Sequence, residues 1–118
     1  MAAHIICPVG EFPENTHRVV KIRSIEIGVF NVNGTFYALP NVCPHQFGPL
    51  CEGTVNGTTA CNAETSWQTA WVRDGEILTC PWHGWEYDIT TGRSLSKPKI
   101  RVRTYPVTVE DGQIVVTL

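Results

Sequence analysis

The sequence predicts an all-β fold, an antiparallel sandwich or barrel. Short runs rich in β-branched and aromatic residues recur along the chain, Gly, Asn and Asp punctuate them, and helical periodicity is almost absent. This combination is typical of several short strands that are joined by tight turns. The chain has 118 residues and a mass of 13.1 kDa, which fits a single domain over residues 1–118.

The clearest element is a hairpin in the first third of the chain. Residues 25–32 include two isoleucines, two valines and a phenylalanine, and residues 35–39 form a second apolar run. Asn33-Gly34 lies between them, and this dipeptide favours the positive φ angles that a two-residue hairpin turn requires. We therefore expect two paired antiparallel strands here.

The C-terminal region repeats this pattern. Asp111-Gly112 separates residues 100–109 from residues 113–118, which predicts a second hairpin. Pro106 interrupts the first arm of this hairpin and therefore predicts a bend or a bulge there, because proline has no N–H group to donate to a neighbouring strand.

The middle of the chain is less regular. Asp74-Gly75 separates residues 71–73 from residues 77–79 and predicts a further turn. Residues 54–70 differ in character from the rest, and we interpret them as a polar surface loop, although Asn62 is placed to cap a single helical turn. Two tryptophans in this region are expected to be core or loop anchors, namely Trp67 and Trp71.

The composition argues against several classes of function. The formal net charge is −2 and the pI is about 6.0, so no basic excess favours nucleic acid as a partner. No run approaches the roughly 20 apolar residues of a membrane span, and no secretory signal is evident, so we expect a cytoplasmic protein. In that compartment an odd number of cysteines, five, indicates metal or redox chemistry rather than a disulfide scaffold.

Two short motifs carry the candidate ligands. Cys43-Pro44-His45 and Cys80-Pro81-Trp82-His83 each supply one thiolate and one imidazole, and each lies where a predicted strand gives way to a loop. The proline after each cysteine stiffens the backbone and so lowers the entropy cost of holding the ligands in place. Together the two loops offer four ligands, which is a complete metal site.

Ligand chemistry alone leaves two types of centre open. Two cysteines and two histidines bind one Zn²⁺ tetrahedrally. The same four side chains bind a [2Fe-2S] cluster when the cysteines take one iron and the histidines the other. Each loop here mixes the two ligand types, and this arrangement suits a cluster with two iron atoms.

These motifs resemble those of the Rieske-type ferredoxins, which are small electron carriers. Besides the Cys-x-His and Cys-x-x-His pairs, residues 48–50 (Gly-Pro-Leu), 84–85 (Gly-Trp) and 87–92 follow in the family's order. The resemblance is strong over residues 38–118 and extends in outline to the N-terminal third. It implies an antiparallel β base domain with a small cluster-binding subdomain, formed by two loops at about 43–53 and 80–88.

The resemblance also implies a cofactor and its ligands. One [2Fe-2S] cluster per subunit is expected, with Cys43 and Cys80 on the inner iron and His45 and His83 on the outer, more exposed iron. The 34 residues between His45 and Cys80 exceed the family's usual spacing. We interpret the excess as an insertion at about residues 54–70, which loop-closure entropy tolerates easily.

Four positions near the motifs bear on the reduction potential. The Rieske proteins of respiratory complexes have a disulfide at the positions of Gly48 and Trp82 and a serine at the position of Trp85, whereas Tyr87 matches their cluster-directed tyrosine. With fewer hydrogen bonds to the cluster sulfurs, the reduced state is less stabilised. We therefore predict a potential in the lower part of the Rieske range.

The family resemblance implies an electron carrier rather than an enzyme. It would take one electron at a time from a flavin-dependent reductase and deliver it to a terminal oxygenase, because the chain is too short for an oxygenase's catalytic domain and shows no separate 2-His-1-carboxylate set. Two alternatives remain at this stage. One is the small subunit of an assimilatory nitrite reductase, and the other is a zinc-binding or redox-sensing module that uses the same four ligands.

Several residues outside the motifs receive ordinary interpretations. Cys7 and Cys61 are expected to be simple thiols and Cys51 a small buried filler. Lysines and arginines alternate with Ile100 and Val102 along one segment, so we expect them on a solvated outer face; they are Lys97, Lys99, Arg101 and Arg103. The sequence does not indicate an oligomeric state.

Overall fold

The computed structural model describes residues 2–44, 48–82, 84–97 and 99–118. Short antiparallel strands make up most of this part of the chain, which confirms the predicted all-β fold. The strands are β1 (Ala3–Pro8), β2 (His17–Ile22), β3 (Ile25–Val32), β4 (Thr35–Pro40), β5 (Thr54–Ala60), β6 (Ala70–Thr79), β7 (Glu86–Asp88), β8 (Val107–Glu110) and β9 (Gln113–Thr117). The 3-10 helices are η1 (Val9–Glu11), η2 (Leu50–Glu52) and η3 (Ala63–Thr65).

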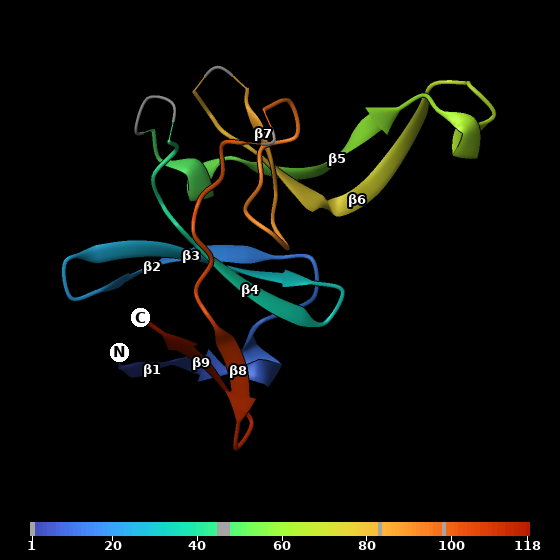
Figure 1. Cartoon of the computed structure of the whole chain (residues 1–118). Coiled ribbons are helices and arrows are strands. Elements are labelled where there is room, and N and C mark those ends of the chain that lie inside the picture. The colour runs from blue at the N-terminus through green and yellow to red at the C-terminus, as the bar shows by residue number, and fades with distance from the viewer. Residues whose placement is uncertain (1, 45–47, 83, 98) are drawn as a thin grey trace.

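The strands form three small sheets that lie one above another in Figure 1. The sheet β1-β9-β8 lies at the bottom, β2-β3-β4 in the middle and β5-β6-β7 at the top. The two termini lie side by side, because Ala2 and Leu118 exchange two backbone hydrogen bonds. Within the described residues, no helix has the length and apolar character needed to cross a membrane.

The middle sheet supplies side chains to two separate cores. In β3, Ile27 and Val29 pack in one apolar cluster with Ile114 of β9, whereas Phe30 and Val32 pack in the other. Successive side chains of a strand point to opposite faces of its sheet, so this alternation directs one set downwards and the other upwards. The upper core joins the middle sheet to the top sheet and includes the cysteines of both motifs.

Both predicted hairpins are confirmed. Asn33 and Gly34 have φ angles of 51° and 91°, and Asp111 and Gly112 have φ angles of 52° and 74°. The first hairpin pairs β3 with β4, and the second pairs β8 with β9. The first arm of the C-terminal hairpin is shorter than predicted, because β8 begins only after Pro106 and residues 102–104 form no regular strand.

The predicted turn at Asp74-Gly75 is wrong. β6 runs through it as one strand, and the residues on both sides pair with β5 rather than with each other: Asn56 is opposite Ile77, and Thr58 is opposite Val72. Residues 73–76 therefore form a bulge, with Arg73 at φ 56° and Gly75 at φ 85°. The dipeptide does adopt the backbone conformation of a turn, but β5 pairs with β6 on both sides of it, so the result is a bulge within one strand and not the end of a strand.

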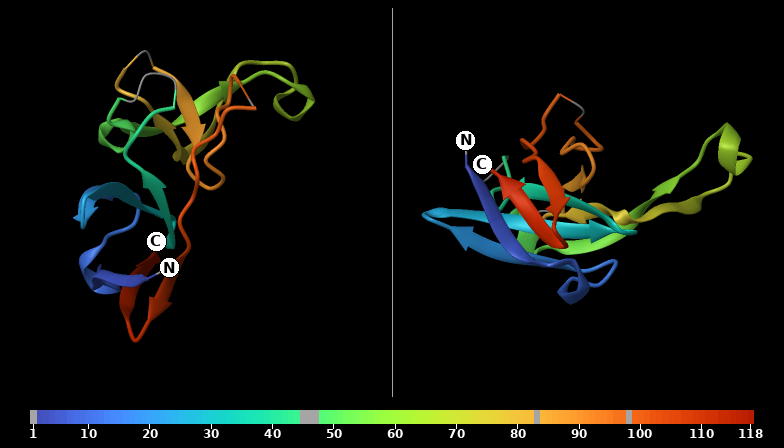
Figure 2. Two further views of the ribbon diagram at one scale, coloured as in Figure 1. Left: turned by 60° about the vertical axis from the view of Figure 1, so that its left-hand side comes forward. Right: turned by 90° about the horizontal axis from the view of Figure 1, so that it is seen from below.

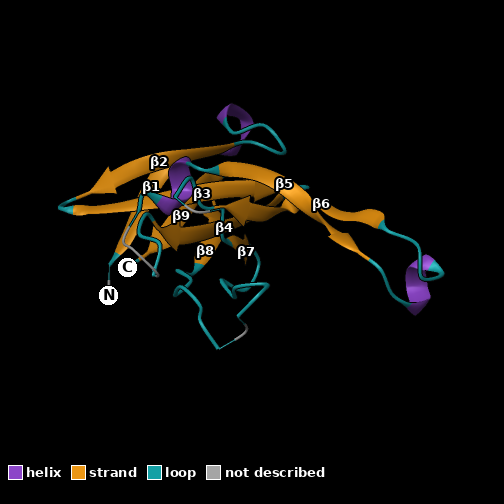
Figure 3. Cartoon of the chain, turned by 90° about the horizontal axis from the view of Figure 1, so that it is seen from above, coloured by secondary structure: helices purple, strands orange, loops and turns teal. Residues whose placement is uncertain are grey.

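The interpretation of residues 54–70 as a surface loop is also wrong in part. Residues 54–60 are strand β5, and β5 and β6 form a hairpin arm that projects from the body with η3 at its tip (Figures 2 and 3). The expected cap by Asn62 is confirmed, since its side chain accepts from the N–H of Thr65. Trp67 and Trp71 are 70% and 57% exposed, so they are not core anchors.

Candidate metal centre

Two loops of matching construction carry the two motifs. The first follows β4 and is closed by a hydrogen bond of 2.8 Å from the N–H of Cys43 to the carbonyl of Gly48. The second follows β6 and is closed by a bond of the same length, from the N–H of Cys80 to the carbonyl of Trp85. Each cysteine thus opens a six-residue loop whose backbone ends are tied together, and such a loop holds its ligands with little loss of entropy on binding.

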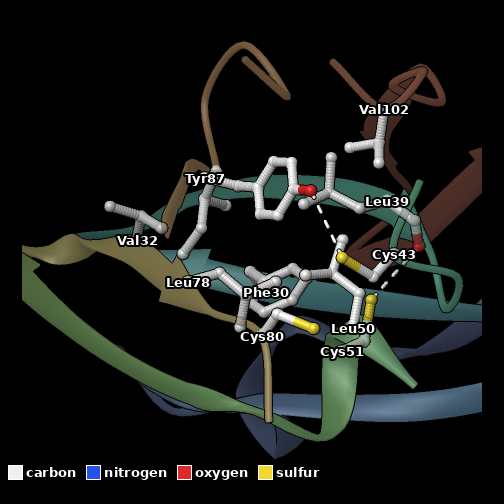
Figure 4. Close-up of a cluster of buried hydrophobic side chains, with 11 residues drawn as sticks. Phe30, Val32, Leu39, Cys43, Leu50, Cys51, Leu78, Cys80, Tyr87 and Val102 are labelled. Carbon is white, nitrogen blue, oxygen red and sulfur yellow. Dashed lines mark hydrogen bonds between the residues drawn. The ribbon is translucent and has the colours of Figure 1, made fainter. Parts of the chain in front are cut away.

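The two cysteine side chains meet in the upper core. Cys43 and Cys80 are 0% and 1% exposed, and the Cys80 thiol is in hydrogen-bonding contact with Cys43. Figure 4 shows both thiols at the same end of the core, with Tyr87 reaching towards Cys43. The hydroxyl of Tyr87 lies 3.2 Å from the Cys43 sulfur, a hydrogen-bonding distance.

Burial determines the protonation states of these cysteine and tyrosine side chains. Burial is the largest cause that raises the pKa of the Cys80 thiol, a hydrogen bond from the Trp82 backbone lowers it, and the neighbouring Cys43 raises it, so that the net pKa is about 11. Burial and Cys43 also raise the pKa of Tyr87, whose hydroxyl stays protonated. A metal binds the thiolate form and so displaces the thiol protons. Two adjacent buried thiols from separate loops fit the sulfur half of the predicted ligand set.

The nitrogen half of the set lies outside the described residues. Both predicted histidine ligands, His45 and His83, fall in the gaps of the structure. Within the described ranges, no three His, Cys, Asp or Glu side chains gather as a metal site. Because each histidine is two or three residues from a fixed cysteine, inside a loop whose ends are closed, its position along the chain is compatible with the predicted site.

A contact between the two loops was not predicted. Gly48 of the first loop lies under the indole ring of Trp82 in the second, and a Cβ atom at Gly48 would meet the ring at 2.7 Å. Only glycine allows this approach, so the ring connects the two loops without a covalent bond. The sequence did hold a signal for it, because these two positions match the disulfide of the respiratory relatives.

A buried polar side chain fastens the first loop to the middle sheet. Asn41 is 5% exposed, donates to the carboxylates of Glu26 and Glu52, and accepts from the N–H of Cys51. These bonds hold η2 against the end of β4. The signal in the sequence that could have revealed this role is a polar residue directly after a strand.

The prediction that Cys51 is a small buried filler is confirmed. It is 0% exposed, and its sulfur lies so close to Gly28 that a Cβ atom there would be 2.5 Å away. Burial raises its pKa to about 12, so the thiol stays protonated. All five cysteines are described and none forms a disulfide; Cys7 is half-buried, and Cys61 is exposed at the tip of the arm.

An ion pair fixes β7, the strand that follows the second loop. Arg73 donates to Asp88 at 2.7 Å and to Glu76 at 3.2 Å. Burial acts to raise the pKa of Asp88, but hydrogen bonds from Thr90 and Arg73 outweigh it and leave the pKa below the usual value. Asp88 follows Tyr87 in β7, so this pair fixes the strand that presents the tyrosine to Cys43.

Known proteins resemble this chain along its whole length. The 3-phenylpropionate/cinnamic acid dioxygenase ferredoxin subunit of Photorhabdus laumondii is 28% identical over 119 residues, covering 100% of this chain and 96% of that protein. The protein of the same name from Escherichia coli K12 is 30% identical, covering 95% and 90%.

Solved structures of ferredoxins share the fold. The Sphingomonas yanoikuyae B1 ferredoxin has a TM-score of 0.72 and 28% identity, and the match covers 99% of each chain. A chain in the complex of reduced oxygenase and oxidized ferredoxin in carbazole 1,9a-dioxygenase has a TM-score of 0.73 and 25% identity, covering 98% of this chain and 92% of that one.

The family model of the Rieske [2Fe-2S] domain matches residues 2–106. This match covers both motifs, the paired thiols, and the middle and top sheets described above, and it ends just before β8. It decides between the two metal centres that ligand chemistry left open, because the family implies a [2Fe-2S] cluster rather than a single zinc ion. The chain belongs to the Rieske [2Fe-2S] domain family.

Proposed function

We propose that this protein is a ferredoxin that carries one electron at a time from a flavin-dependent reductase to a terminal oxygenase. Residues 1–118 form one domain, in which Cys43, His45, Cys80 and His83 hold the [2Fe-2S] cluster. It acts as a carrier in a multi-component oxygenase system and is not itself the enzyme. Its compartment is the cytoplasm, where thiols stay reduced.

The observation that carries this proposal is the pair of closed loops with adjacent buried thiols. They match the sulfur ligands expected for one iron of a Rieske cluster. The relatives support the direction of electron flow, since they are ferredoxin subunits of dioxygenases, and one related structure is a complex of a ferredoxin with its oxygenase.

When bound, the cluster supplies one-electron redox chemistry. The protein's own residues keep the site rigid and dry. The two backbone hydrogen bonds fix the loop ends, and the upper core covers both cysteines so that water does not reach them. The Tyr87 hydroxyl lies within hydrogen-bonding distance of the Cys43 sulfur and would donate to its thiolate, and the backbone N–H of Trp82 donates to the Cys80 sulfur. Such bonds stabilise negative charge on sulfur and therefore favour the reduced state.

The test begins with the purified protein. We expect two irons and two acid-labile sulfides per chain, a red-brown colour, and the low-average-g EPR signal of a Rieske centre after reduction. Mixing it with a dioxygenase reductase and oxygenase should then couple NADH oxidation to substrate oxidation, and omission of the protein should stop that coupling. A colourless protein that holds zinc would contradict the proposal at the first step.

A further inference from the structure

The positive charge of this acidic protein is concentrated in one loop. Five of the nine lysines and arginines fall within residues 92–103, the basic loop, and none of the eleven aspartates and glutamates does. The rest of the chain therefore has four cations against all eleven carboxylates. The five are Arg93, Lys97, Lys99, Arg101 and Arg103.

Backbone contacts close the neck of the basic loop, where residues 92–94 meet residues 100–102. Arg93 and Arg101 form an antiparallel bridge, the N–H of Ser94 donates to the carbonyl of Ile100 at 3.0 Å, and the N–H of Val102 donates to Gly92 at 2.8 Å. Gly92 has a φ of 79° and lies against the Val102 carbonyl, so the neck of the loop is tight. The cations are presented from a closed loop rather than from a loose tail.

The inner side of the loop packs over the cluster site. Val102 is 6% exposed and belongs to the same core as Cys43 and Cys80, and Figure 4 draws it as a member of that core. The neighbouring Arg101 and Arg103 are exposed, as alternation along an extended segment requires. A protein that binds to the outer side of the basic loop is therefore separated from the core around the cysteines by a single segment of the chain.

The loop's cations have no internal counterions among the described residues. The ion pairs in this part of the molecule involve Arg73, with Glu76 and Asp88, and none of the five cations of the basic loop. Neighbouring like charges repel one another, so this arrangement costs stability unless a partner supplies negative charge. Arg103 lies over the Tyr105 ring, 5.1 Å from its centre, which limits its freedom without neutralising it.

We propose that the basic loop is a docking surface for the acidic face of a redox partner protein. The inference rests on the proposed electron-carrier function, since it names the surface that an electron partner uses. Charge complementarity steers a partner to the loop and raises the rate of encounter by roughly 10- to 1,000-fold. One electron then passes between the partner's redox group and the cluster, and no covalent bond forms or breaks.

The experiment uses the intact holoprotein and flavodoxin, a small acidic flavoprotein that donates single electrons, as the probe. The test variant is Lys99→Glu, with Lys97→Glu/Lys99→Glu as a stronger form. The matched control is Arg23→Glu, which makes the same change in net charge at the exposed turn between β2 and β3. The dissociation constant for oxidised flavodoxin and the rate of cluster reduction by its hydroquinone are measured at low and physiological salt.

We expect the wild type to bind and react faster at low salt, the double variant to lose at least about tenfold in both, and the control to change by less than twofold. Equal effects of Lys99→Glu and Arg23→Glu would overturn the proposal, as would no salt-dependent binding by the wild type. Salt-dependent binding through the loop without reduction supports the docking surface and contradicts the electron-carrier function. Cluster reduction that is unaffected by the charge changes in the basic loop supports the electron-carrier function and contradicts the docking surface.

Discussion

At the scale of single residues, burial and neighbours divide the five cysteines by role. Cys43 and Cys80 are buried side by side, Cys51 is buried against a glycine, and Cys7 and Cys61 reach solvent. The motif spacing predicts that Cys43 and Cys80 are the ligands, because the cysteine and histidine of each loop are close in sequence, and the structure places these two cysteines side by side. The filler role of Cys51 was predictable only from its apolar neighbour, Leu50.

The first prediction separates the filler from the ligands. Cys51→Ala removes a buried sulfur and leaves a small cavity, so the free energy of unfolding should fall by about 1 kcal/mol. Iron and sulfide content should stay at the wild-type level, since this thiol is not a ligand. Denaturant unfolding and metal analysis check both parts. A loss of iron equal to that of Cys43→Ala would contradict the assignment.

The second prediction concerns Tyr87. Tyr87→Phe removes the hydroxyl that lies 3.2 Å from the Cys43 sulfur. A hydrogen bond to the more negative, reduced state is worth about 1 kcal/mol, so the reduction potential should drop by some tens of millivolts. A redox titration measures the change. The wild type itself should titrate in the lower part of the Rieske range, and an unchanged or raised potential in the variant would contradict the role of the hydroxyl.

The third prediction follows from His17. Its ring stacks on Phe30 with centroids 5.1 Å apart, and burial lowers its pKa below the ordinary 6.5, partly offset by a hydrogen bond to the Cys51 backbone. The unfolded state therefore binds a proton more readily than the folded state. The contribution of His17 to stability is full above pH 6.5 and is lost as the pH falls below it.

Unfolding of the holoprotein between pH 7.5 and 5.5 should therefore show a smaller loss of stability with acid in His17→Gln than in the wild type. His4→Gln, in β1, is the control and should follow the wild type. Identical pH profiles for the wild type and His17→Gln would show that this histidine does not titrate as the burial requires.

At the scale of elements, hairpins with a two-residue turn were predictable and the arm was not. Asn33-Gly34 and Asp111-Gly112 require positive φ at both positions, and local sequence fixes that requirement. Asp74-Gly75 gives the same signal, but β5 pairs with both sides of it and makes a bulge. The pairing depends on residues 54–60, whose polar composition resembles that of a loop, so no local pattern could reveal it.

The contact between the two cluster loops gives a prediction at this scale. A methyl group at Gly48 would lie 2.7 Å from the Trp82 ring, so Gly48→Ala must displace the ring. Such overpacking costs about 1–3 kcal/mol, and loss of iron to a chelator should become about tenfold faster. Gly10→Ala is the matched control, since a Cβ there meets nothing within 4 Å. Equal rates of iron loss in both variants would contradict the contact's role.

At the scale of the whole molecule, the stack of three sheets follows from the central hairpin. β3 is buried on both faces from Ile27 to Val32, and it alternates between the lower and upper cores. The hydrophobic pattern predicted an all-β fold, but a run that is apolar on both faces does not specify which sheets cover it. That depends on contacts between strands far apart in the sequence, such as β3 with β9.

The central claim is that two cysteines bind one iron of a single [2Fe-2S] cluster and two histidines bind the other iron. Mössbauer spectroscopy of the ⁵⁷Fe-enriched, oxidised holoprotein tests it most directly, because iron bound by sulfur and iron bound by nitrogen differ in isomer shift. We predict two iron signals of equal area with different isomer shifts, and loss of both signals in Cys43→Ala. Two equivalent irons of the kind found in all-cysteine clusters, or a single isolated iron, would contradict the account.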